Sequence, residues 1–417
     1  MPKHCQIRYQ MLCIILTVFR GPPDCAFHSP NSPYLSNRTI QIHPMKIKVN
    51  RDHLFAALAQ ATNILHSSGA SLPILSCTLI DARENRLTIT ANNLDHAVRC
   101  SIAATVAEPG IIALPAKRLA EIVRELPQVD VSIATNDKER ATIKAGESTF
   151  TVSGFAATEY PAWGEVKAEK MIDIDQATLA VMIRGVAFAQ STDESRYTLK
   201  GIFFDAQAES LALVATDGRR LSVANHPTAK GMGTGKFILP SNSIAALVRL
   251  LGSGTNVKIV FNERQVAFEI DADKAKELTG TIEYISKIVE GTFPNYQQVI
   301  PKETTHRVEF ERESLAECVH RAALVCSEKA NSVKLGFDKG MLSISAQSPD
   351  FGEALDTLAI AYDGPEAKIA FNPAFLLDPL RSLVTDKIAF EFKDEMSPGV
   401  LRSGERFVCV VMPVRLS

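Results

Sequence analysis

The segment Leu87-Thr-Ile-Thr-Ala91 recurs as Leu211-Ala-Leu-Val-Ala215 and again as Leu342-Ser-Ile-Ser-Ala346. Each copy is typical of a β-strand, and a polar turn and a second strand are expected to follow it. The three copies begin 124 and 131 residues apart. A constant spacing of this size indicates that the chain repeats one structural unit three times.

Two further elements recur in the same order. An amphipathic helix precedes each strand and carries a leucine at its fifth position, namely Leu54, Leu179 and Leu315. A strand, a short break and a second helix follow in ranges 112–126, 237–251 and 369–383. Units of two helices and many short strands predict an α+β fold, unlike the alternating βαβ order of nucleotide-binding sheets.

The unit boundaries are expected where an aromatic residue and a proline meet, in ranges 160–164 and 293–296. These positions predict domains at 45–167, 168–301 and 302–417. The preceding residues, 1–44, contain an apolar stretch at 11–19 that imitates a signal peptide. The favoured interpretation is a disordered extension or a start that truly lies at Met45, because regular folded sequence begins there.

Composition excludes several classes of protein. Lys and Arg number 45 against 47 Asp and Glu, so the net charge of -2 excludes a histone-like DNA-binding protein. No apolar run reaches the roughly 18 residues of a membrane span. Five of the eight cysteines lie in the repeated body, form no CxxC pair and have no histidine at zinc-ligand spacing. They are expected to be reduced core residues of a cytoplasmic protein, with a metal or redox role as the alternative.

Motifs of catalysis are incomplete. The segment 231–236 imitates a phosphate loop, but Lys230 stands where glycine is required and Phe237 where Ser or Thr is required. The sequence has no G-x-S-x-G and no H-E-x-x-H, and its nine histidines are scattered. We therefore expect no enzyme, no metal site and no cofactor.

The segment Ala215-Thr-Asp-Gly-Arg-Arg-Leu221 joins two predicted strands through Asp217-Gly218, which is a strong hairpin signal. Taken alone, it predicts a turn and nothing more. The equivalent ranges 91–95 and 346–350 lack the paired arginines. A feature that one repeat of three possesses is not needed for the fold, so it is a candidate functional site.

Five segments together resemble a known family, and they are spread over the whole body. They are Leu72-Pro-Ile-Leu75, Arg196-Tyr-Thr-Leu199, Ala215 to Leu221, Gly291-Thr-Phe-Pro-Asn-Tyr296 and the terminal Val410-Val-Met-Pro-Val-Arg-Leu416. This set resembles the bacterial sliding clamps, the β subunits of DNA polymerase III, over residues 45–416. The resemblance implies a head-to-tail homodimer closed into a ring of six domains, with helices inside and sheets outside.

The resemblance also implies a function without catalysis. Such a ring is a processivity factor of DNA replication that encircles double-stranded DNA and tethers the polymerase. The implied partners are the DNA polymerase III catalytic subunit, the clamp loader and other proteins with a clamp-binding motif, such as repair polymerases, ligase and mismatch repair proteins. Their motif, of the type Gln-Leu-x-Leu-Phe, would bind in a peptide groove.

The site residues follow from the same resemblance, position by position. The implied peptide groove consists of Leu199, Thr216, Gly218, Arg219, Arg220, Leu221, Pro294, Val299, Val410, Met412, Pro413, Val414 and Arg415. The implied dimer interface consists of Phe150, Val152, Leu324 and Val325, with Arg140 and Lys144 facing Asp350, Glu353 and Asp356. The implied DNA-facing residues are Arg196, Tyr197, Lys117, Arg118, Arg124, Arg184, Arg249, Arg321 and Arg381.

Other readings of these residues stay open at this point. Leu221 and Val410 could equally be plain core residues, and each basic residue could lie on an ordinary solvated helix face. The six repeat helices carry nine Lys and Arg against eight Asp and Glu, with four of the acids in opening turns. Two alternatives to a ring on DNA are a peptide-binding scaffold that does not encircle DNA and an enzyme such as a nuclease, which would need clustered metal-binding carboxylates. The chain also departs from the family at Thr198 and Gln298, where an aromatic and a basic residue occur in relatives.

Overall fold

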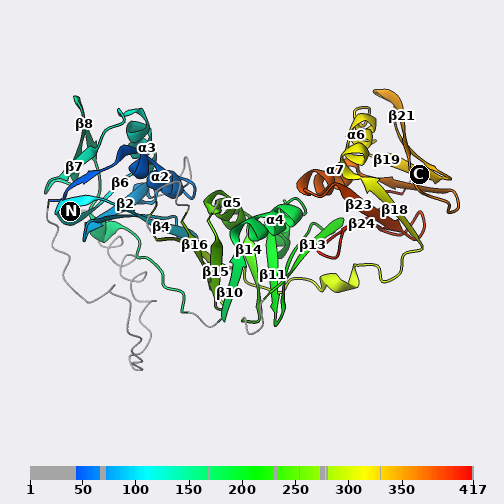
Figure 1. Cartoon of the computed structure of the whole chain (residues 1–417), viewed down its shortest axis with the longest axis horizontal. Coiled ribbons are helices and arrows are strands. Elements are labelled where there is room, and N and C mark those ends of the chain that lie inside the picture. The colour runs from blue at the N-terminus through cyan, green and yellow to red at the C-terminus, as the bar shows by residue number, and fades with distance from the viewer. Residues whose placement is uncertain are drawn as a thin grey trace, which may run out of the picture. The chain divides into compact units, whose positions relative to one another are not determined.

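The computed structural model describes residues 44–65, 72–167, 170–228, 233–252, 254–272, 278, 280–328 and 330–415. The expectations for residues 1–43 fall outside these ranges and remain predictions. Among the described residues, no helix combines the length and the apolar character that crossing a membrane requires. The predicted α+β architecture is confirmed, with two α-helices and a set of antiparallel strands in each repeat (Figure 1).

The elements follow the same order in the three repeats, except that the short strand β5 occurs in the first repeat alone among the described residues. The first repeat contains β1 (Lys46–Val49), α2 (Arg51–Thr62), β2 (Cys77–Arg83), β3 (Arg86–Asn92), β4 (His96–Ala103), β5 (Thr105–Glu108), β6 (Gly110–Pro115), α3 (Ala116–Glu125), β7 (Val131–Thr135), β8 (Arg140–Ala145) and β9 (Ser148–Ser153). The second contains β10 (Lys170–Asp175), α4 (Gln176–Ala187), the 3-10 helix η3 (Glu194–Leu199), β11 (Gly201–Gln207), β12 (Ser210–Thr216), β13 (Arg220–Pro227), β14 (Gly235–Pro240), α5 (Ser241–Leu250), β15 (Asn256–Phe261), β16 (Gln265–Asp271) and β17 (Thr281–Lys287). The third contains β18 (His306–Glu311), α6 (Arg312–Ala323), β19 (Val333–Asp338), β20 (Met341–Ser348), β21 (Gly352–Ala359), β22 (Ala367–Phe371), α7 (Pro373–Ser382), β23 (Lys387–Phe392), β24 (Gly399–Ser403) and β25 (Phe407–Val411).

Local sequence explains where the first helix begins in the first and second repeats. The side chain of Asn50 accepts a hydrogen bond from the backbone N–H of Asp52 at 2.9 Å, and so caps α2. The side chain of Asp175 caps α4 in the same way, accepting from the N–H of Thr178 at 2.8 Å. The leucines predicted at the fifth position are all buried, which confirms that these helices turn one apolar face to the core.

Two eight-stranded antiparallel sheets run across the repeat boundaries. One has the order β10-β15-β16-β17-β4-β3-β2-β6, so β17 of the second repeat pairs with β4 of the first. The other has the order β14-β11-β12-β13-β25-β24-β23-β18, so β25 of the third repeat pairs with β13 of the second. Consecutive repeats are therefore joined by continuous backbone hydrogen bonding.

The two remaining sheets have five and four strands, about half of the eight in each sheet described above, and are called half-sheets below. One has the order β5-β1-β7-β8-β9 and ends on β9, while the other has the order β21-β20-β19-β22 and ends on β21. In the repeat, β9 is the equivalent of β17 and β25, and β21 is the equivalent of β4 and β13. Strand β17 pairs with β4, and β25 pairs with β13. Their equivalents β9 and β21 have no such partner in the described chain. Within the described chain, each of these two strands is a sheet edge.

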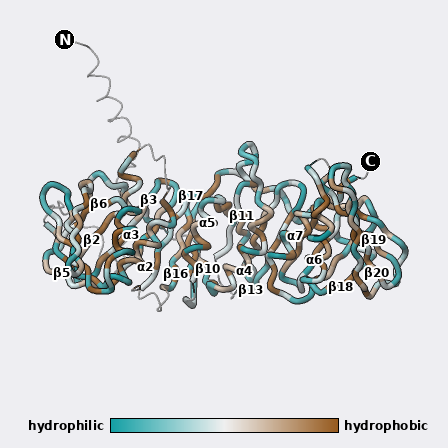
Figure 2. Tube along the Cα trace, turned by 90° about the horizontal axis from the view of Figure 1, so that it is seen from above, coloured by the Kyte–Doolittle hydropathy of each residue, from teal (hydrophilic) through white to brown (hydrophobic). Residues whose placement is uncertain are grey.

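The core fills the space between helices and sheets. A cluster of buried residues extends through the first and second repeats, and a second cluster fills the third. A smaller cluster covers the other face of the sheet that contains β13 and β25, and includes Phe203, Leu221, Phe293 and Val410. Figure 2 shows hydrophobic and hydrophilic residues interleaved along the elements, as amphipathic helices and strands require.

The five described cysteines are free thiols, as the sequence predicted. Cys100 and Cys409 are fully buried, and burial raises the pKa of each thiol to about 12. Because the thiolate is the reactive form, these two side chains are expected to be inert in the folded protein.

We predict that iodoacetamide at pH 8 leaves Cys100 and Cys409 unmodified in the native protein and modifies both after unfolding in urea. Peptide mass spectrometry reads the two sites separately from all other cysteines. Native modification of Cys409 at the rate of the unfolded chain would contradict the burial described above.

Candidate functional site

The hairpin predicted at Asp217-Gly218 is present between β12 and β13. The Asp217 carboxylate accepts hydrogen bonds from the backbone N–H groups of Arg219 and Arg220, at 2.8 and 3.0 Å. The N–H of Gly218 donates to the Thr216 hydroxyl, which donates in turn to the carbonyl of Arg220 at 2.6 Å. Gly218 has φ +85°, a conformation that other residues adopt only with strain. The sequence thus folds into a turn whose polar groups are held internally.

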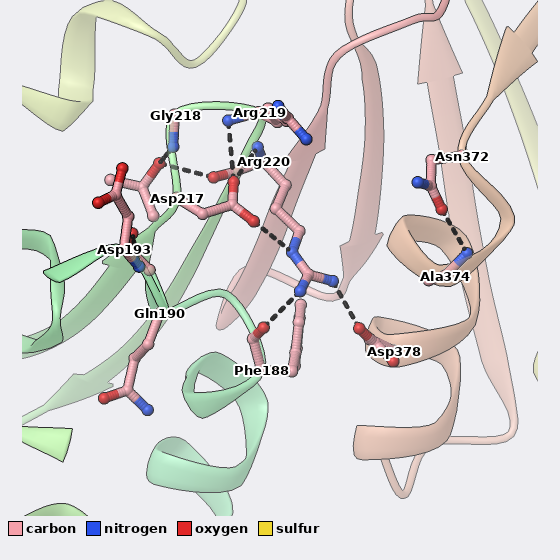
Figure 3. A network of polar contacts seen from close by, with 12 residues as sticks. Phe188, Gln190, Asp193, Asp217, Gly218, Arg219, Arg220, Asn372, Ala374 and Asp378 are labelled. Carbon is pink, nitrogen blue, oxygen red and sulfur yellow. Dashed lines mark hydrogen bonds and ion pairs between the residues drawn. The ribbon is translucent and has the colours of Figure 1, made fainter. Parts of the chain in front are cut away.

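Arg220 extends from this turn toward the third repeat (Figure 3). Its Nε lies 3.1 Å from the Asp217 carboxylate, and its Nη1 lies 2.6 Å from that of Asp378 in α7. Its Nη2 donates to the carbonyl of Phe188, just after α4, at 2.6 Å. The guanidinium also lies 4.6 Å from the ring centre of Phe375 and is only 10% exposed. Arg220 therefore connects three elements and two repeats.

The C-terminal segment lies beside this hairpin. Strand β25 pairs with β13 in the register Leu221 opposite Val410, and the N–H of Met412 then donates to the carbonyl of Arg219 at 3.0 Å. Two residues later, the N–H of Val414 donates to the carbonyl of Ala370 at 2.8 Å. The segment after β25 is thus fixed at both of these points.

The implied groove residues fall into two groups by burial. Gly218, Arg219, Pro294, Val299, Met412, Val414 and Arg415 are exposed, and Leu199, Thr216, Arg220 and Pro413 are partly exposed. Leu221 and Val410 are 2% and 1% exposed and belong to the small core cluster beneath this surface. Burial agrees with the alternative of a core role, and the place of these two residues in the groove wall remains a prediction.

The shared cluster beneath the surface explains why distant segments meet here. Phe293 stacks on Phe203 of β11 with ring centres 4.7 Å apart, which anchors the segment that carries Pro294. The hydroxyl of Tyr296 donates to Asp205 at 3.3 Å and holds the next turn. Leu199 also packs against this cluster. The implied wall therefore comes from four segments that share one small core.

Comparison with known proteins gives a consistent result along the chain. Family models match three consecutive stretches: the N-terminal domain of the DNA polymerase III beta subunit at residues 45–164, the central domain at 173–295 and the C-terminal domain at 297–415. The beta sliding clamp of Caulobacter vibrioides is 32% identical, and the alignment covers 89% of this chain and all of that protein. The beta sliding clamp of Escherichia coli K12 is 29% identical, with the same coverage of both chains.

The chain belongs to the bacterial sliding clamp family.

Solved structures agree with this assignment. A sliding clamp from Bartonella birtlesii, determined with griselimycin bound, superposes with a TM-score of 0.83 at 29% identity and covers 90% of this chain and all of that one. The clamp from Bacillus subtilis gives a TM-score of 0.84 at 26% identity, with the same coverage of both chains. Sliding clamps are non-catalytic processivity factors, so the expectation that the protein is not an enzyme is confirmed by its family.

The implied DNA-facing residues of this clamp differ in their exposure and in their hydrogen bonds. Lys117, Arg118, Arg124, Arg184, Arg249 and Arg381 are exposed on α3, α4, α5 and α7. Arg196 and Tyr197 lie in η3, and Arg196 donates to the carbonyl of Asp217 at 3.1 Å. The segment η3 is thereby attached to the groove hairpin, a contact that the sequence did not predict.

Arg321 is engaged inside the clamp subunit. Its Nε lies 2.6 Å from the carboxylate of Asp356 in β21, and its Nη1 lies 3.7 Å from Glu317. The hydrogen bond from Arg321 lowers the pKa of the Asp356 carboxyl group, so the pair stays ionised. The charge of Arg321 is therefore partly compensated within the subunit, and its role toward DNA remains a prediction.

The same ion pair involves one of the expected interface acids, Asp356. Because side chains alternate along a strand, Asp356 points to α6 while Glu353 points to the opposite face of β21. Arg140 and Lys144 lie on the face of β8 opposite the buried Ala141. Asp356 is thus engaged within its own subunit, and its place opposite these two basic residues remains a prediction.

The remaining implied apolar interface residues lie on the edge strand β9 and directly after α6, the helix that packs on β21. Phe150 on β9 is exposed and Val152 beside it is buried, while Leu324 after α6 is 70% exposed and Val325 is partly exposed. Sequence reasoning missed two apolar residues beside them: Phe351 is 65% exposed before β21, and Leu355 is 72% exposed within it. The signal that could have found them is a large apolar residue on the outward face of a predicted edge strand.

Two cavities lie away from the groove residues. One cavity of about 380 Å³ is lined by residues of β18, α6 and the end of β21, and another of about 260 Å³ lies beside the turn between β3 and β4. In the described part of the chain, no three His, Cys, Asp or Glu side chains gather as metal ligands would.

Proposed function

We propose that the hairpin of residues 216–221 and the segment after β25 form the groove in which this sliding clamp binds the peptide motifs of its partners. The observation that carries the proposal is the hydrogen bond from Met412 to the carbonyl of Arg219. It holds an apolar chain from the third domain beside a basic turn from the second. Binding sites commonly form at such domain junctions.

The clamp tethers the replicative polymerase during DNA synthesis. It acts as a homodimer that encircles double-stranded DNA, and it binds the polymerase and other proteins that carry clamp-binding motifs. We propose that these include the clamp loader, repair polymerases, ligase and mismatch repair proteins. We propose domains at 45–167, 168–301 and 302–417, and a cytoplasmic location, because the bacterial chromosome on which clamps work lies there.

The exposed residue types suit a peptide with apolar and polar positions. Met412, Val414 and Val299 offer apolar surface to Leu and Phe side chains, and methionine adapts its shape to different partners. Arg219 and Arg415 can hold a Gln side chain or an acidic group at the rim. Gln298 adds no charge there, so we assign polar recognition to the two arginines.

Removal of residues 412–417 tests the groove. We expect the truncated clamp to bind a fluorescein-labelled Gln-Leu-Ser-Leu-Phe peptide at least about 100-fold more weakly, because the apolar side of the slot is lost. Polymerase stimulation should fall with it, whereas the dimer should persist because β25 ends before the deletion. Fluorescence anisotropy measures affinity, and unchanged affinity would exclude this groove.

The two half-sheets support head-to-tail closure of the ring. Each internal sheet joins one unit's four strands to the next unit's strands, so β21 of one subunit is the natural neighbour of β9 in its partner. Unpaired edges of this kind readily pair with another chain. We propose that Phe150 and Val152 meet Leu324 and Val325 across this boundary, and that Arg140 and Lys144 face Asp350 and Glu353. Phe351 and Leu355 add apolar area.

Charge placed in this interface should prevent dimerisation. We expect Phe150→Asp and Val325→Asp to sediment as monomers at low protein concentration, because a buried unpaired carboxylate is strongly unfavourable. Val384→Asp is a matched control, since Val384 is also an exposed valine but lies after α7, away from both edges. Dimeric sedimentation of both interface variants would contradict the proposed boundary.

If the clamp encircles DNA, its retention on DNA should depend on whether the DNA is circular or linear. With a net charge of -2, the clamp should bind short linear duplexes weakly, and this binding should fall steeply with salt. After loading onto a nicked circular plasmid, it should stay with the circle in gel filtration and leave once a restriction enzyme linearises it. Equal retention on circular and linear DNA would instead favour a scaffold that does not encircle DNA.

A further inference from the structure

The two junctions between domains are built on one plan. In the first joint, β4 pairs with β17, and the N–H of Lys287 donates to the carbonyl of Asp95 at 2.9 Å. In the second joint, β13 pairs with β25, and the N–H of Met412 donates to the carbonyl of Arg219 at 3.0 Å. In both joints, a backbone N–H at the end of the strand from the later domain therefore bonds the same turn position, Asp95 in the first and Arg219 in the second.

The residue directly after each turn makes equivalent contacts in the two joints. His96 is the first residue of β4, and Arg220 is the first residue of β13. The Nε2 atom of His96 lies 3.4 Å from the carbonyl of Ile64, which follows α2. In the same way, Arg220 donates to the carbonyl of Phe188, which follows α4. The Nδ1 atom of His96 lies 3.2 Å from the hydroxyl of Ser243 in α5, the second helix of the next domain. Asp378, the partner of Arg220, lies in α7, the second helix of the third domain.

The proposed groove lies at the second joint, and there this position makes ionic contacts. All three guanidinium nitrogens of Arg220 are engaged, by Asp217, Asp378 and the carbonyl of Phe188. The rings of Phe188 and Phe375 pack against the same group. With a side chain only 10% exposed, Arg220 has little capacity left to contact a bound peptide.

We propose that Arg220 is a positioning residue, which fixes the second domain's hairpin against α7 and so sets the spacing of the groove walls without contacting the partner peptide. The inference rests on the proposed groove. The hairpin that bears Arg219 belongs to the second domain, whereas α7 and the segment that bears Met412 belong to the third. Asp378 connects the second domain's hairpin to the third domain through Arg220.

The physical consequence concerns the population of the binding-competent state. Without the ionic link, the hairpin and α7 can shift relative to each other, and only a fraction of molecules keeps the walls at the spacing that a peptide fits. The apparent affinity falls by that fraction. A directly contacting Arg220 would behave differently, because loss of Asp378 would free its guanidinium for the peptide.

The variants Asp378→Ala and Asp378→Asn in the full-length dimer separate these two cases. The probe is the labelled Gln-Leu-Ser-Leu-Phe peptide, with dissociation constants from fluorescence anisotropy. We expect Asp378→Ala to weaken binding about tenfold, within the range of coupling through packed networks. Asp378→Asn, which keeps the size of the side chain, should weaken it less. Arg220→Ala should weaken binding by a similar or larger factor, and Arg220→Lys should not restore it, because one ammonium group cannot reach three partners.

The double variant Arg220→Ala with Asp378→Ala adds a test of coupling. If the two residues act as one link, the double variant should bind the peptide no more weakly than Arg220→Ala alone. His96→Ala is the matched control, since it removes the equivalent residue from the first joint. We expect it to leave the peptide affinity within about twofold of wild type.

A local readout accompanies the affinities. Hydrogen exchange at the amide of Met412 should accelerate in both Asp378 variants, because that amide bonds the carbonyl of Arg219 across the joint. In His96→Ala the amide of Lys287 should accelerate instead. A merely global loss of stability would accelerate both amides in every variant.

Two outcomes would overturn the assignment. If both Asp378 variants bind the peptide as tightly as wild type while Arg220→Ala does not, Arg220 contacts the peptide directly. If exchange at Met412 is unchanged in the Asp378 variants, the link does not hold the joint. Failure of the wild-type clamp to bind the peptide would instead refute the groove itself, and the exchange measurement would still decide the role of Arg220 in the joint.

Discussion

Backbone pairing across the domain boundaries is the constraint on which the rest of the structure depends. Strand β25 completes the sheet that β13 begins, and β17 completes the sheet that β4 begins. Hydrogen bonds of this kind fix register as well as distance, since a shift by one residue would move every side chain to the other face. The orientation of each domain toward the next is therefore set by a strand ladder, with the polar contacts of one turn residue added at each joint.

The ladder also decides where chemistry for binding partners can gather. Because β25 ends beside the turn between β12 and β13, Met412 emerges next to Arg219. The same ladder exists at the first joint, where Asp95 and Lys287 take the corresponding places and form an ion pair at 3.3 Å. One architecture thus produces a basic and apolar surface at one joint and a charge-neutralised surface at the other. The difference lies in a few side chains and not in the backbone.

Much of the fold could be predicted because the signals are local and are repeated three times. The buried leucines Leu54, Leu179 and Leu315, the turn at Asp217-Gly218 and the free cysteines all follow from periodicity, turn chemistry and composition. The candidate site could be predicted only in part. Its residues were named through a family resemblance, and burial then divided them, because a sequence motif does not distinguish the outward face of a strand from the inward face.

The sequence by itself determined that three α+β units follow one another, that the second carries an unusual basic turn, and that the chain ends in an apolar segment. Only the tertiary structure decided that Leu221 and Val410 lie beneath the surface, that Arg321 pairs with Asp356, and that Arg220 reaches Asp378, 158 residues later in the chain. The reason is physical. Periodicity and turn propensity act over a few neighbouring residues, whereas the partner of a charged side chain depends on which distant segments the sheets bring within hydrogen-bonding distance.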